Sequence, residues 1–177
     1  MRKEIRICGS GGQGVILLSV VLAHAYGLYE GFEVAQSQAY GPEARGGACH
    51  ADVVISDEPI DYIHVEKADI LIAMNQVGYS KFKDATEDNA MVFIDSSFFE
   101  TVPDSTIAVN ATDTARNELK PFAANIVMLG YVTARMSDLS IENVEKSLRS
   151  QLPEKLQDLN VKALWLGYEM GKKYGSV

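Results

Sequence analysis

The sequence has few of the residues that several functional classes require. Its two cysteines, Cys8 and Cys49, form no C-x-x-C site, so we expect reduced thiols in a cytoplasmic protein. The 16 Lys and Arg against 24 Asp and Glu give a net charge of −8, which argues against a nucleic-acid partner, since that requires a basic face. No apolar run reaches the roughly 18–20 residues of a membrane span. The N-terminus also lacks the pattern of a signal peptide.

The 177 residues predict a single domain over residues 1–177. Short apolar runs alternate with helical patterns in the first half, which is typical of a parallel α/β sheet. We expect strands at 5–8, 32–36, 51–56, 69–75, 91–96 and 106–111, and helices at 15–26, 77–85, 111–119, 122–136, 141–152 and 161–174. Residues 81–89 are interpreted as a solvated helix end and loop. The predicted fold is one doubly wound, mainly parallel, Rossmann-like α/β sheet with a helical C-terminal third.

The segment 9-GSGGQG-14 stands between the first predicted strand and the first predicted helix. A strand that turns at once into a helix leaves backbone N–H groups unpaired at the positive end of the helix dipole. Glycines let a phosphate approach this backbone without meeting a Cβ, and Ser10 and Gln13 add side-chain hydrogen-bonding groups. The loop therefore predicts a site for a phosphate or another anion. The alternative is that the glycines only permit tight packing of strand on helix.

Neither common nucleotide fingerprint is complete. A dinucleotide site needs a carboxylate at the end of the second strand to hold the ribose, but that strand ends 34-VAQSQ-38, and Glu33 lies at its other end. A Walker A loop needs Lys and Ser or Thr after its last glycine, where this chain has Val15 and Ile16. A nicotinamide dehydrogenase is therefore disfavoured.

A second unusual segment, 40-YGPEARGG-47, lies between two predicted strands. Tyr40 can stack on a ring, Arg45 can hold a phosphate or carboxylate in a bidentate manner, and Gly46 and Gly47 allow close approach of the backbone. The alternative is a surface turn with an internal Glu43–Arg45 pair. Asn75 ends another strand at the edge where doubly wound sheets bind ligands, so we expect it to line the same cleft.

The two motifs together resemble those of the gamma subunit of 2-oxoacid:ferredoxin (acceptor) oxidoreductases. The matching pieces are 9-GSGGQGV-15 and 37-SQAYGPEARGG-47, supported by residues 53–76 and by 125-NIVMLG-130. The resemblance covers nearly the whole chain, and the Y-G-P-E-A-R-G-G form looks most like the 2-oxoglutarate type.

This resemblance implies one subunit of an enzyme that converts 2-oxoglutarate and coenzyme A to succinyl-CoA and CO₂ and reduces ferredoxin, flavodoxin or a similar acceptor. Alpha and beta subunits, with a ferredoxin-like delta subunit, are the implied partners, and they are expected to carry thiamine diphosphate, Mg and the iron–sulfur clusters. Two separated cysteines cannot ligate a cubane cluster, which needs four thiolates. We therefore expect this chain to hold no cofactor alone, to share coenzyme A with its partners, and to contribute to assembly rather than to redox chemistry.

Twelve residues are the candidates for contact with coenzyme A, with no catalytic or metal-binding residue expected: Gly9, Ser10, Gly11, Gly12, Gln13, Gly14, Tyr40, Glu43, Arg45, Gly46, Gly47 and Asn75. Cys49 and His50 are adjacent on an extended segment and should point to opposite faces, so they are not expected to act as a catalytic pair. Two alternatives remain open. One is a subunit for another 2-oxoacid, of the pyruvate or indolepyruvate type, and the other is a free-standing nucleotide-binding enzyme.

Overall fold

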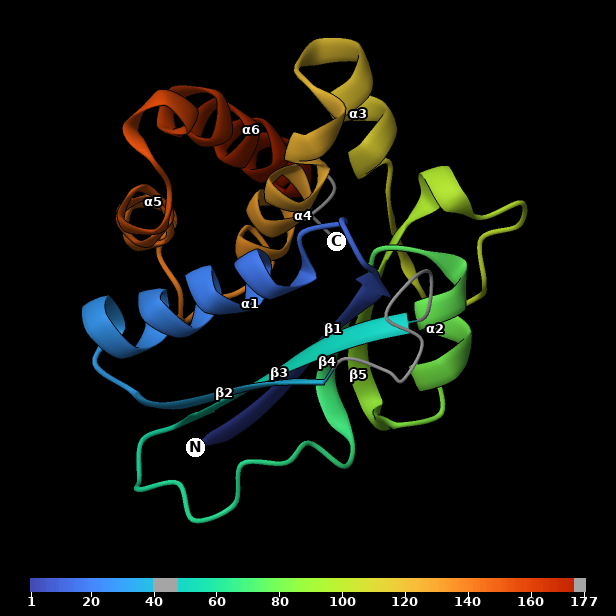
Figure 1. Ribbon diagram of the computed structural model, residues 1–177. Coiled ribbons are helices and arrows are strands. Elements are labelled where there is room, and N and C mark those ends of the chain that lie inside the picture. The colour runs from blue at the N-terminus through green and yellow to red at the C-terminus, as the bar shows by residue number, and fades with distance from the viewer. Residues whose placement is uncertain (40–47, 174–177) are drawn as a thin grey trace.

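One six-stranded sheet forms the centre of the molecule (Figure 1). The computed structural model describes residues 1–39 and 48–173. The strand order is β2-β3-β1-β4-β5-β6. The strand bounds are β1 Arg2–Ser10, β2 Glu33–Ala39, β3 Ala48–Ser56, β4 Ala68–Ala73, β5 Thr86–Asp95 and β6 Ile107–Val109.

The sheet is mainly parallel, as predicted, but β3 runs against its neighbours. β1 pairs in parallel with β4, β4 with β5, and β5 with β6, whereas β3 is antiparallel to both β1 and β2. The connection from β2 to β3 is only eight residues, 40–47. A parallel crossover needs a dozen residues or more, so the short connection forces the antiparallel pairing.

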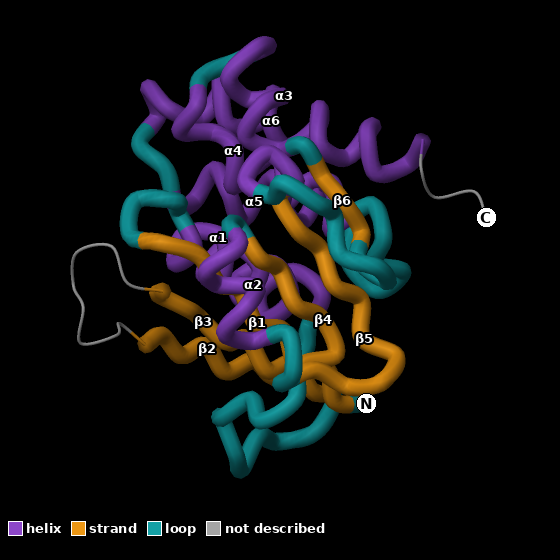
Figure 2. Tube along the Cα trace, turned by 90° about the vertical axis from the view of Figure 1, so that its right-hand side faces the viewer, coloured by secondary structure: helices purple, strands orange, loops and turns teal. Residues whose placement is uncertain are grey.

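Helices cover the two faces of the sheet unequally (Figures 1 and 2). The first face is covered by α1 (Val15–His24) and α4 (Ala124–Thr133), and α5 (Ile141–Gln151) and α6 (Glu154–Lys173) pack on these two helices. This side contains the largest of the apolar clusters among the described residues. The second face packs against the short α2 (Gln76–Phe82) and the connection 57–67. The sheet is therefore doubly wound, as predicted, with one thick and one thin outer layer.

The C-terminal third is helical, as predicted, from α3 (Ala111–Glu118) onward. The nearly all-apolar segment at 122–136 forms the 3₁₀ turn Pro121–Ala123 followed by α4, and all ten residues of α4 are buried within the chain. A helix without a polar face is stable only when other elements surround it, and here α3, α6 and Phe93 of β5 do so.

Several element boundaries differ from the prediction. α6 begins at Glu154 rather than at 161, because Pro153 starts its first turn, where the Leu156 N–H donates to the Pro153 carbonyl oxygen at 2.9 Å. β5 begins at Thr86, within the stretch expected to be a helix end and loop. Residues 87–89 are exposed, so the alternation that predicts a half-buried strand is absent there. The helix predicted at 77–85 ends at Phe82, and α1 continues as a π-helix over Ala25–Glu30.

Across the described ranges 1–39 and 48–173, no helix has both the length and the apolar character that a membrane span requires.

Candidate functional site

The glycine loop lies at the point where the winding of the sheet reverses. β1 leads through α1 on the first face to β2 at one edge, and β4 leads through α2 on the second face to β5 on the other side. In open α/β sheets, ligands bind outside the carboxyl ends of the strands at such a switch point. Gly9 and Ser10 form the end of β1, and Gly11 to Gly14 connect it to α1. Asn75 follows β4, and its side chain contacts Ser10 and Gln13; its place in a ligand cleft stays a prediction.

Gln13 and Asn75 brace the loop from within. The Asn75 Nδ2 donates to Ser10 Oγ at 2.7 Å and to Gln13 Oε1 at 2.8 Å. The Gln13 Oε1 also accepts from the Ser10 N–H at 2.8 Å, and the Gln13 Nε2 donates to the Met74 carbonyl oxygen at 3.0 Å. The Asn75 Oδ1 accepts from the Gly78 N–H at 2.8 Å and caps α2. The side chain of Gln13 is thus occupied within the protein; its contact with a ligand stays a prediction.

Gly14 packs against a residue that the sequence did not single out. It has a φ of +72° and precedes α1. The Asn125 Nδ2, from the first turn of α4, donates to the Gly14 carbonyl oxygen at 3.2 Å, and a Cβ on Gly14 would clash with the Asn125 amide. Asn125 is buried. The first turn of α4 therefore holds the end of the glycine loop in place.

Gly11 and Gly12 form the open part of the loop. Both are exposed, and no heavy atom of the described chain lies within 4 Å of where a Cβ would stand on either one. The first turn of α1 has no acidic residue and no side-chain cap, which leaves its N–H groups available to an anion. A cavity of about 340 Å³ lies here, lined by Ser10, Gly11, Gly12, Gly14, Val15, Ile16, Leu17 and Cys49. The geometry suits a bound phosphate.

The second motif, 40–47, lies outside the described residues. Tyr40, Glu43, Arg45, Gly46 and Gly47 belong to the stretch 40–47, so their proposed ligand contacts stay predictions. The residues on either side are described: Ala48 pairs with Ser10, and Ala39 pairs with His50. The two motifs therefore join the sheet at the same edge, beside the end of β1.

Cys49 and His50 point to opposite faces of the sheet, as predicted. Cys49 lines the cavity at the glycine loop, and burial raises the pKa of its thiol. The His50 ring packs on Phe82 of α2 with the centroids 4.8 Å apart, and burial lowers the pKa of the imidazole. Cys8 is fully buried on the second face, which raises the pKa of its thiol to about 12. Cys49 and His50 therefore do not form a nucleophile pair, since these two side chains lie on different sides of the sheet.

A buried ion pair that the sequence did not predict lies on the second face. Arg6 donates to both carboxylate oxygens of Asp52, at 2.8 and 2.7 Å, and to the Val65 carbonyl oxygen at 2.6 Å. Its guanidinium also lies 4.9 Å from the centre of the Phe82 ring. The pair ties β1, β3, the connection 57–67 and α2 together. We assign this ion pair a structural role, which is to hold in place the elements that support the glycine loop.

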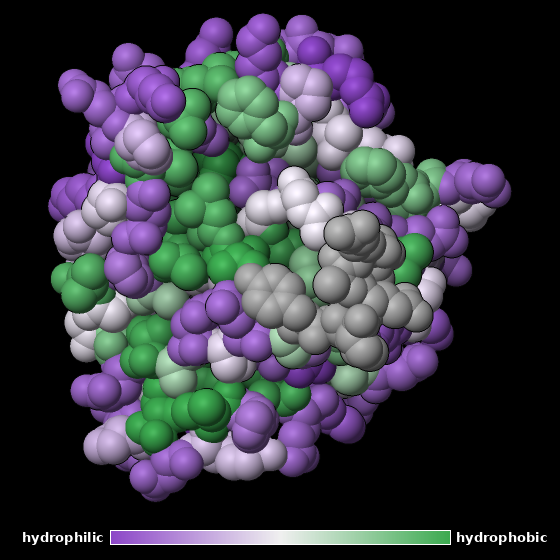
Figure 3. Space-filling view, viewed as in Figure 1, coloured by the Kyte–Doolittle hydropathy of each residue, from purple (hydrophilic) through white to green (hydrophobic). Residues whose placement is uncertain are grey.

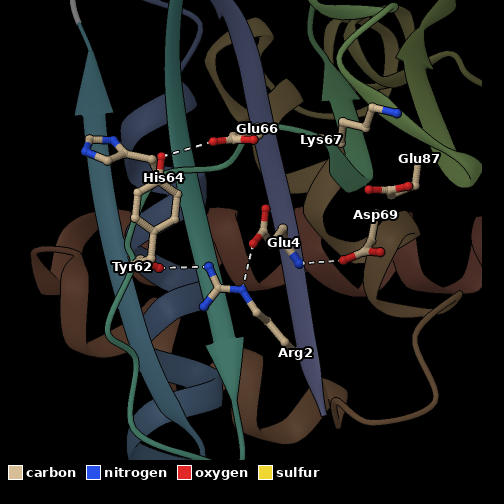
Figure 4. A pocket seen from close by; sticks show the side chains of 8 residues that line it. All are labelled: Arg2, Glu4, Tyr62, His64, Glu66, Lys67, Asp69 and Glu87. Carbon is tan, nitrogen blue, oxygen red and sulfur yellow. Dashed lines mark hydrogen bonds and ion pairs between the residues drawn. The ribbon is translucent and has the colours of Figure 1, made fainter.

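Another cavity, of about 620 Å³, lies at the other end of the sheet (Figure 4). It is lined by Arg2, Glu4, Tyr62, His64, Glu66, Lys67, Asp69 and Glu87. Its polar groups bond to one another: Arg2 Nε to Glu4 Oε1 at 2.7 Å, and Tyr62 Oη to Glu66 Oε1 at 3.2 Å (Figure 4). The amino ends of parallel strands are not where such folds bind ligands, so we place the functional site at the glycine loop instead. In the described part of the chain, no three His, Cys, Asp or Glu side chains gather as a metal site.

The fold and the loop define a Rossmann-like α/β protein built around a glycine-rich turn from strand to helix. Residues 4–170 match the family described as pyruvate ferredoxin/flavodoxin oxidoreductase, and the chain belongs to this family.

Individual members of the family resemble this chain to different degrees. The 2-oxoglutarate synthase subunit KorC of Methanocaldococcus jannaschii is 43% identical, over 98% of this chain and 96% of the relative. The pyruvate synthase subunit PorC of the same organism is 32% identical, over 97% and 99%. The crystal structure of a keto/oxoacid ferredoxin oxidoreductase gamma subunit from Geobacter sulfurreducens superposes with a TM-score of 0.87 and 38% identity, covering 97% of each chain.

A more distant structure shows the same fold within a longer chain. It is a 2-oxoglutarate:ferredoxin oxidoreductase from Magnetococcus marinus with 2-oxoglutarate, coenzyme A and succinyl-CoA bound. The TM-score is 0.86 at 23% identity, and the match covers 97% of this chain and 31% of that one. At this identity the likeness concerns the fold alone.

Proposed function

We propose that this chain is the gamma subunit of a 2-oxoglutarate:ferredoxin oxidoreductase and that its glycine loop helps to bind coenzyme A. The complex converts 2-oxoglutarate and coenzyme A to succinyl-CoA and CO₂, and two electrons pass singly to ferredoxin or a similar acceptor. The observation that carries the substrate class is the higher identity to the 2-oxoglutarate subunit, 43%, than to the pyruvate subunit of the same organism, 32%.

The redox chemistry belongs to partner subunits. The only two cysteines, Cys8 and Cys49, lie on opposite faces of the sheet, whereas a cubane cluster needs four converging thiolates. The residues present thus do not fit an iron–sulfur cluster, and we assign electron transfer to other chains of the complex. Alpha and beta subunits and a ferredoxin-like delta subunit are the partners we propose for the clusters, the thiamine diphosphate and its Mg.

The glycine loop supplies what the phosphates of coenzyme A require. Gly11 and Gly12 leave room for an oxyanion beside the backbone, and the uncapped first turn of α1 presents N–H donors at the positive end of the helix dipole. Asn75, Gln13 and Asn125 hold the loop in that shape before the ligand arrives, so less ordering is needed on binding. Coenzyme A itself supplies the thiol that accepts the succinyl group.

The apolar surface over α1 is consistent with assembly into a complex. Ile16, Leu17 and Val20 are only partly buried, and Figure 3 shows apolar side chains gathered over α1 on the face turned to the viewer. Contiguous apolar surface on a protein commonly marks an interface. We propose that a partner subunit covers this face.

Calorimetric titration of coenzyme A into the assembled complex tests the loop. Gly12→Asp places a Cβ and a carboxylate where the phosphates bind, and we expect the Kd to rise at least about tenfold, or 1.4 kcal/mol. Gly31→Asp is the matched control, because Gly31 has a φ of +81° against +88° for Gly12 and equally free space around it. Equal Kd values for the wild type and Gly12→Asp would contradict the phosphate role.

A substrate panel tests the oxoacid separately. The chain is purified from its host with its partners, and coenzyme A-dependent dye reduction is measured with 2-oxoglutarate, pyruvate and indolepyruvate. We expect 2-oxoglutarate to give the highest kcat/KM. Preference for another oxoacid would move the chain to that type, and NAD reduction by a homogeneous assembly of this chain would favour the free-standing enzyme.

A further inference from the structure

A second, smaller cavity opens on the other side of the glycine loop. Its volume is about 130 Å³, and it is lined by Gly12, Gln13, Met74, Phe98, Thr112, Pro121, Phe122, Ala124 and Asn125. These residues follow β1, β4, β5 and β6 or begin α3 and α4. The cavity therefore lies along the carboxyl edge of four parallel strands, where this kind of sheet binds ligands.

Two exposed aromatic rings line the cavity. Phe98 is 42% exposed and Phe122 is 61% exposed, although phenylalanine is usually buried. Among the nine described lining residues none is charged. A cavity of this kind suits a neutral flat ring, and it is a poor site for a 2-oxoacid, whose carboxylates need cationic or charge-assisted partners.

The inner end of the cavity is polar and rigid. Thr112 donates its hydroxyl to Asp95 Oδ2 at 2.6 Å, and the backbone N–H of Thr112 donates to the same oxygen at 3.1 Å. The amide of Asn125 is held by its bond to the Gly14 carbonyl oxygen. Both side chains keep further hydrogen-bonding capacity, so an amide and a hydroxyl are available to the edge of a heteroaromatic ring.

The cavity adjoins the proposed phosphate site at one residue. Gly12 lines both this cavity and the larger one beside α1. A ligand whose phosphate lies on Gly12 can therefore extend a neighbouring group between Phe98 and Asn125. At 130 Å³ the space is well below the roughly 300–1,000 Å³ of a site that holds a whole drug-sized ligand, which matches one ring system.

We propose that this cavity binds the base of the phosphate-bearing ligand, and that Phe98 and Phe122 contact the adenine ring of coenzyme A. The inference rests on the proposed function, since it assumes that coenzyme A occupies the glycine loop. It adds a site for the base, in which the two phenylalanines, Thr112 and Asn125 all lie outside both sequence motifs.

Ligand fragments separate the base from the rest of coenzyme A. Adenosine 3′,5′-bisphosphate carries the base without the pantetheine arm, and 4′-phosphopantetheine carries the arm and a phosphate without the base. In titrations of the assembled complex, Phe122→Ala and Phe98→Ala are expected to raise the Kd of coenzyme A and of the bisphosphate about tenfold each. The Kd of phosphopantetheine is expected to stay unchanged. Phe122→Leu, which keeps apolar bulk but no ring, should lose most of the same affinity, and Tyr62→Ala, at the far end of the sheet, should lose none.

The variant Gly12→Asp distinguishes failure of the base site from failure of the proposed function. If Gly12→Asp weakens coenzyme A but the phenylalanine variants bind the bisphosphate normally, the base site is wrong and the proposed function stands. If Gly12→Asp changes no affinity, the proposed binding of coenzyme A at the glycine loop fails, and the base site fails with it. If the phenylalanine variants lose partner subunits in size-exclusion chromatography while fragment affinities are unchanged, the rings form a subunit contact, which also overturns the proposal.

Discussion

At the scale of single residues, the glycines of one motif serve different purposes. Gly9 has side-chain atoms of Gln13, Met74 and Val15 within 2.8–3.0 Å of where its Cβ would stand, and Gly14 faces Asn125. Gly11 and Gly12 have free space instead. The sequence left two interpretations of the loop open, tight packing and anion binding. The structure gives packing to the outer glycines and leaves the inner pair free for a ligand.

Replacing Gly14 tests the packing role. Gly14→Ala combines a left-handed φ with a clash against Asn125, so we expect a loss of about 1–3 kcal/mol in the free energy of unfolding. Urea denaturation of the isolated chain measures it. The control Gly11→Ala meets no atom and should stay within about 0.5 kcal/mol of wild type. Because Asn125→Ala removes the clashing amide, the double variant should lose less than the sum of the two single losses; strict additivity would contradict the contact.

At the scale of elements, α4 and α6 cross at very short distance. The sequence 167-GYEMG-171 on α6 presents two glycines one turn apart, and Gly130 lies opposite on α4. A Cβ on Gly167 would clash with the Val127 carbonyl oxygen, and one on Gly130 would clash with the Leu164 carbonyl oxygen. Backbone is in contact with backbone here, which holds the buried helix α4 in position. Since α4 carries Asn125, this crossing also positions the glycine loop.

Gly167→Ala should therefore destabilise the chain despite alanine's higher helix propensity. Forcing the two helices apart in a packed core costs typically about 1–3 kcal/mol, which exceeds the roughly 1 kcal/mol that alanine contributes in a helix interior. Gly27→Ala, where the nearest atom lies 3.5 Å from the added Cβ, is the control and should be neutral or stabilising. Thermal unfolding followed by circular dichroism gives both values. A higher Tm for Gly167→Ala would contradict the close crossing.

At the scale of the whole molecule, the thin side of the sheet depends on the Arg6–Asp52 pair. Arg6 and Asp52 are 7% and 6% exposed, and between them they bond across two strands and to the connection 57–67. Phe82 packs against both the Arg6 guanidinium and the His50 ring. The pair thus fixes α2, whose N-terminal cap Asn75 braces the glycine loop.

Breaking the pair on one side leaves an uncompensated buried charge. We expect Asp52→Ala to lower the free energy of unfolding by about 3–5 kcal/mol. The control Asp113→Ala removes an ion pair with Arg116 whose side chains are half exposed, and it should cost less than about 1 kcal/mol. Replacing both partners, by Arg6→Met with Asp52→Leu, should recover most of the loss, as measured by urea denaturation; equal losses for the single and double variants would contradict an effect of buried charge.

Much of the fold was predictable because it follows from local patterns. The strands predicted at 5–8 and 69–75 and the helix predicted at 141–152 have clear apolar patterns, and the structure has β1, β4 and α5 at these places with ends that differ by a few residues. The antiparallel β3 was not predicted, since its direction depends on which strands pair and no periodicity shows that. The start of α6 was missed because 154-EKLQDLN-160 is mostly polar, and its helical structure depends on packing beside Arg149 and Leu152, whose carbonyl oxygens accept from Gln157.

The candidate site, like the fold, was only partly predictable from the sequence. The glycine loop and Asn75 were predictable from the order of strand, loop and helix. Asn125, Phe98 and Phe122 were not, because each comes from a segment far along the chain with no motif that marks a ligand; the only signal was that Asn125 begins the family-like stretch 125-NIVMLG-130. The residues that complete a site across a sheet edge are neighbours only after the strands have paired.

By itself, the sequence determined the α/β class, the glycine turn and the family, because backbone conformation at glycine and the alternation of strand and helix are local properties. The tertiary structure decided the rest. It inserted β3 between β1 and β2, so that β2 is an edge strand and the dinucleotide geometry, in which the second strand adjoins the first, does not arise. It also brought Phe98, Phe122 and Asn125 to the glycine loop, since only packing of α4 and pairing of β5 and β6 can place residues so far apart in the sequence around one cavity.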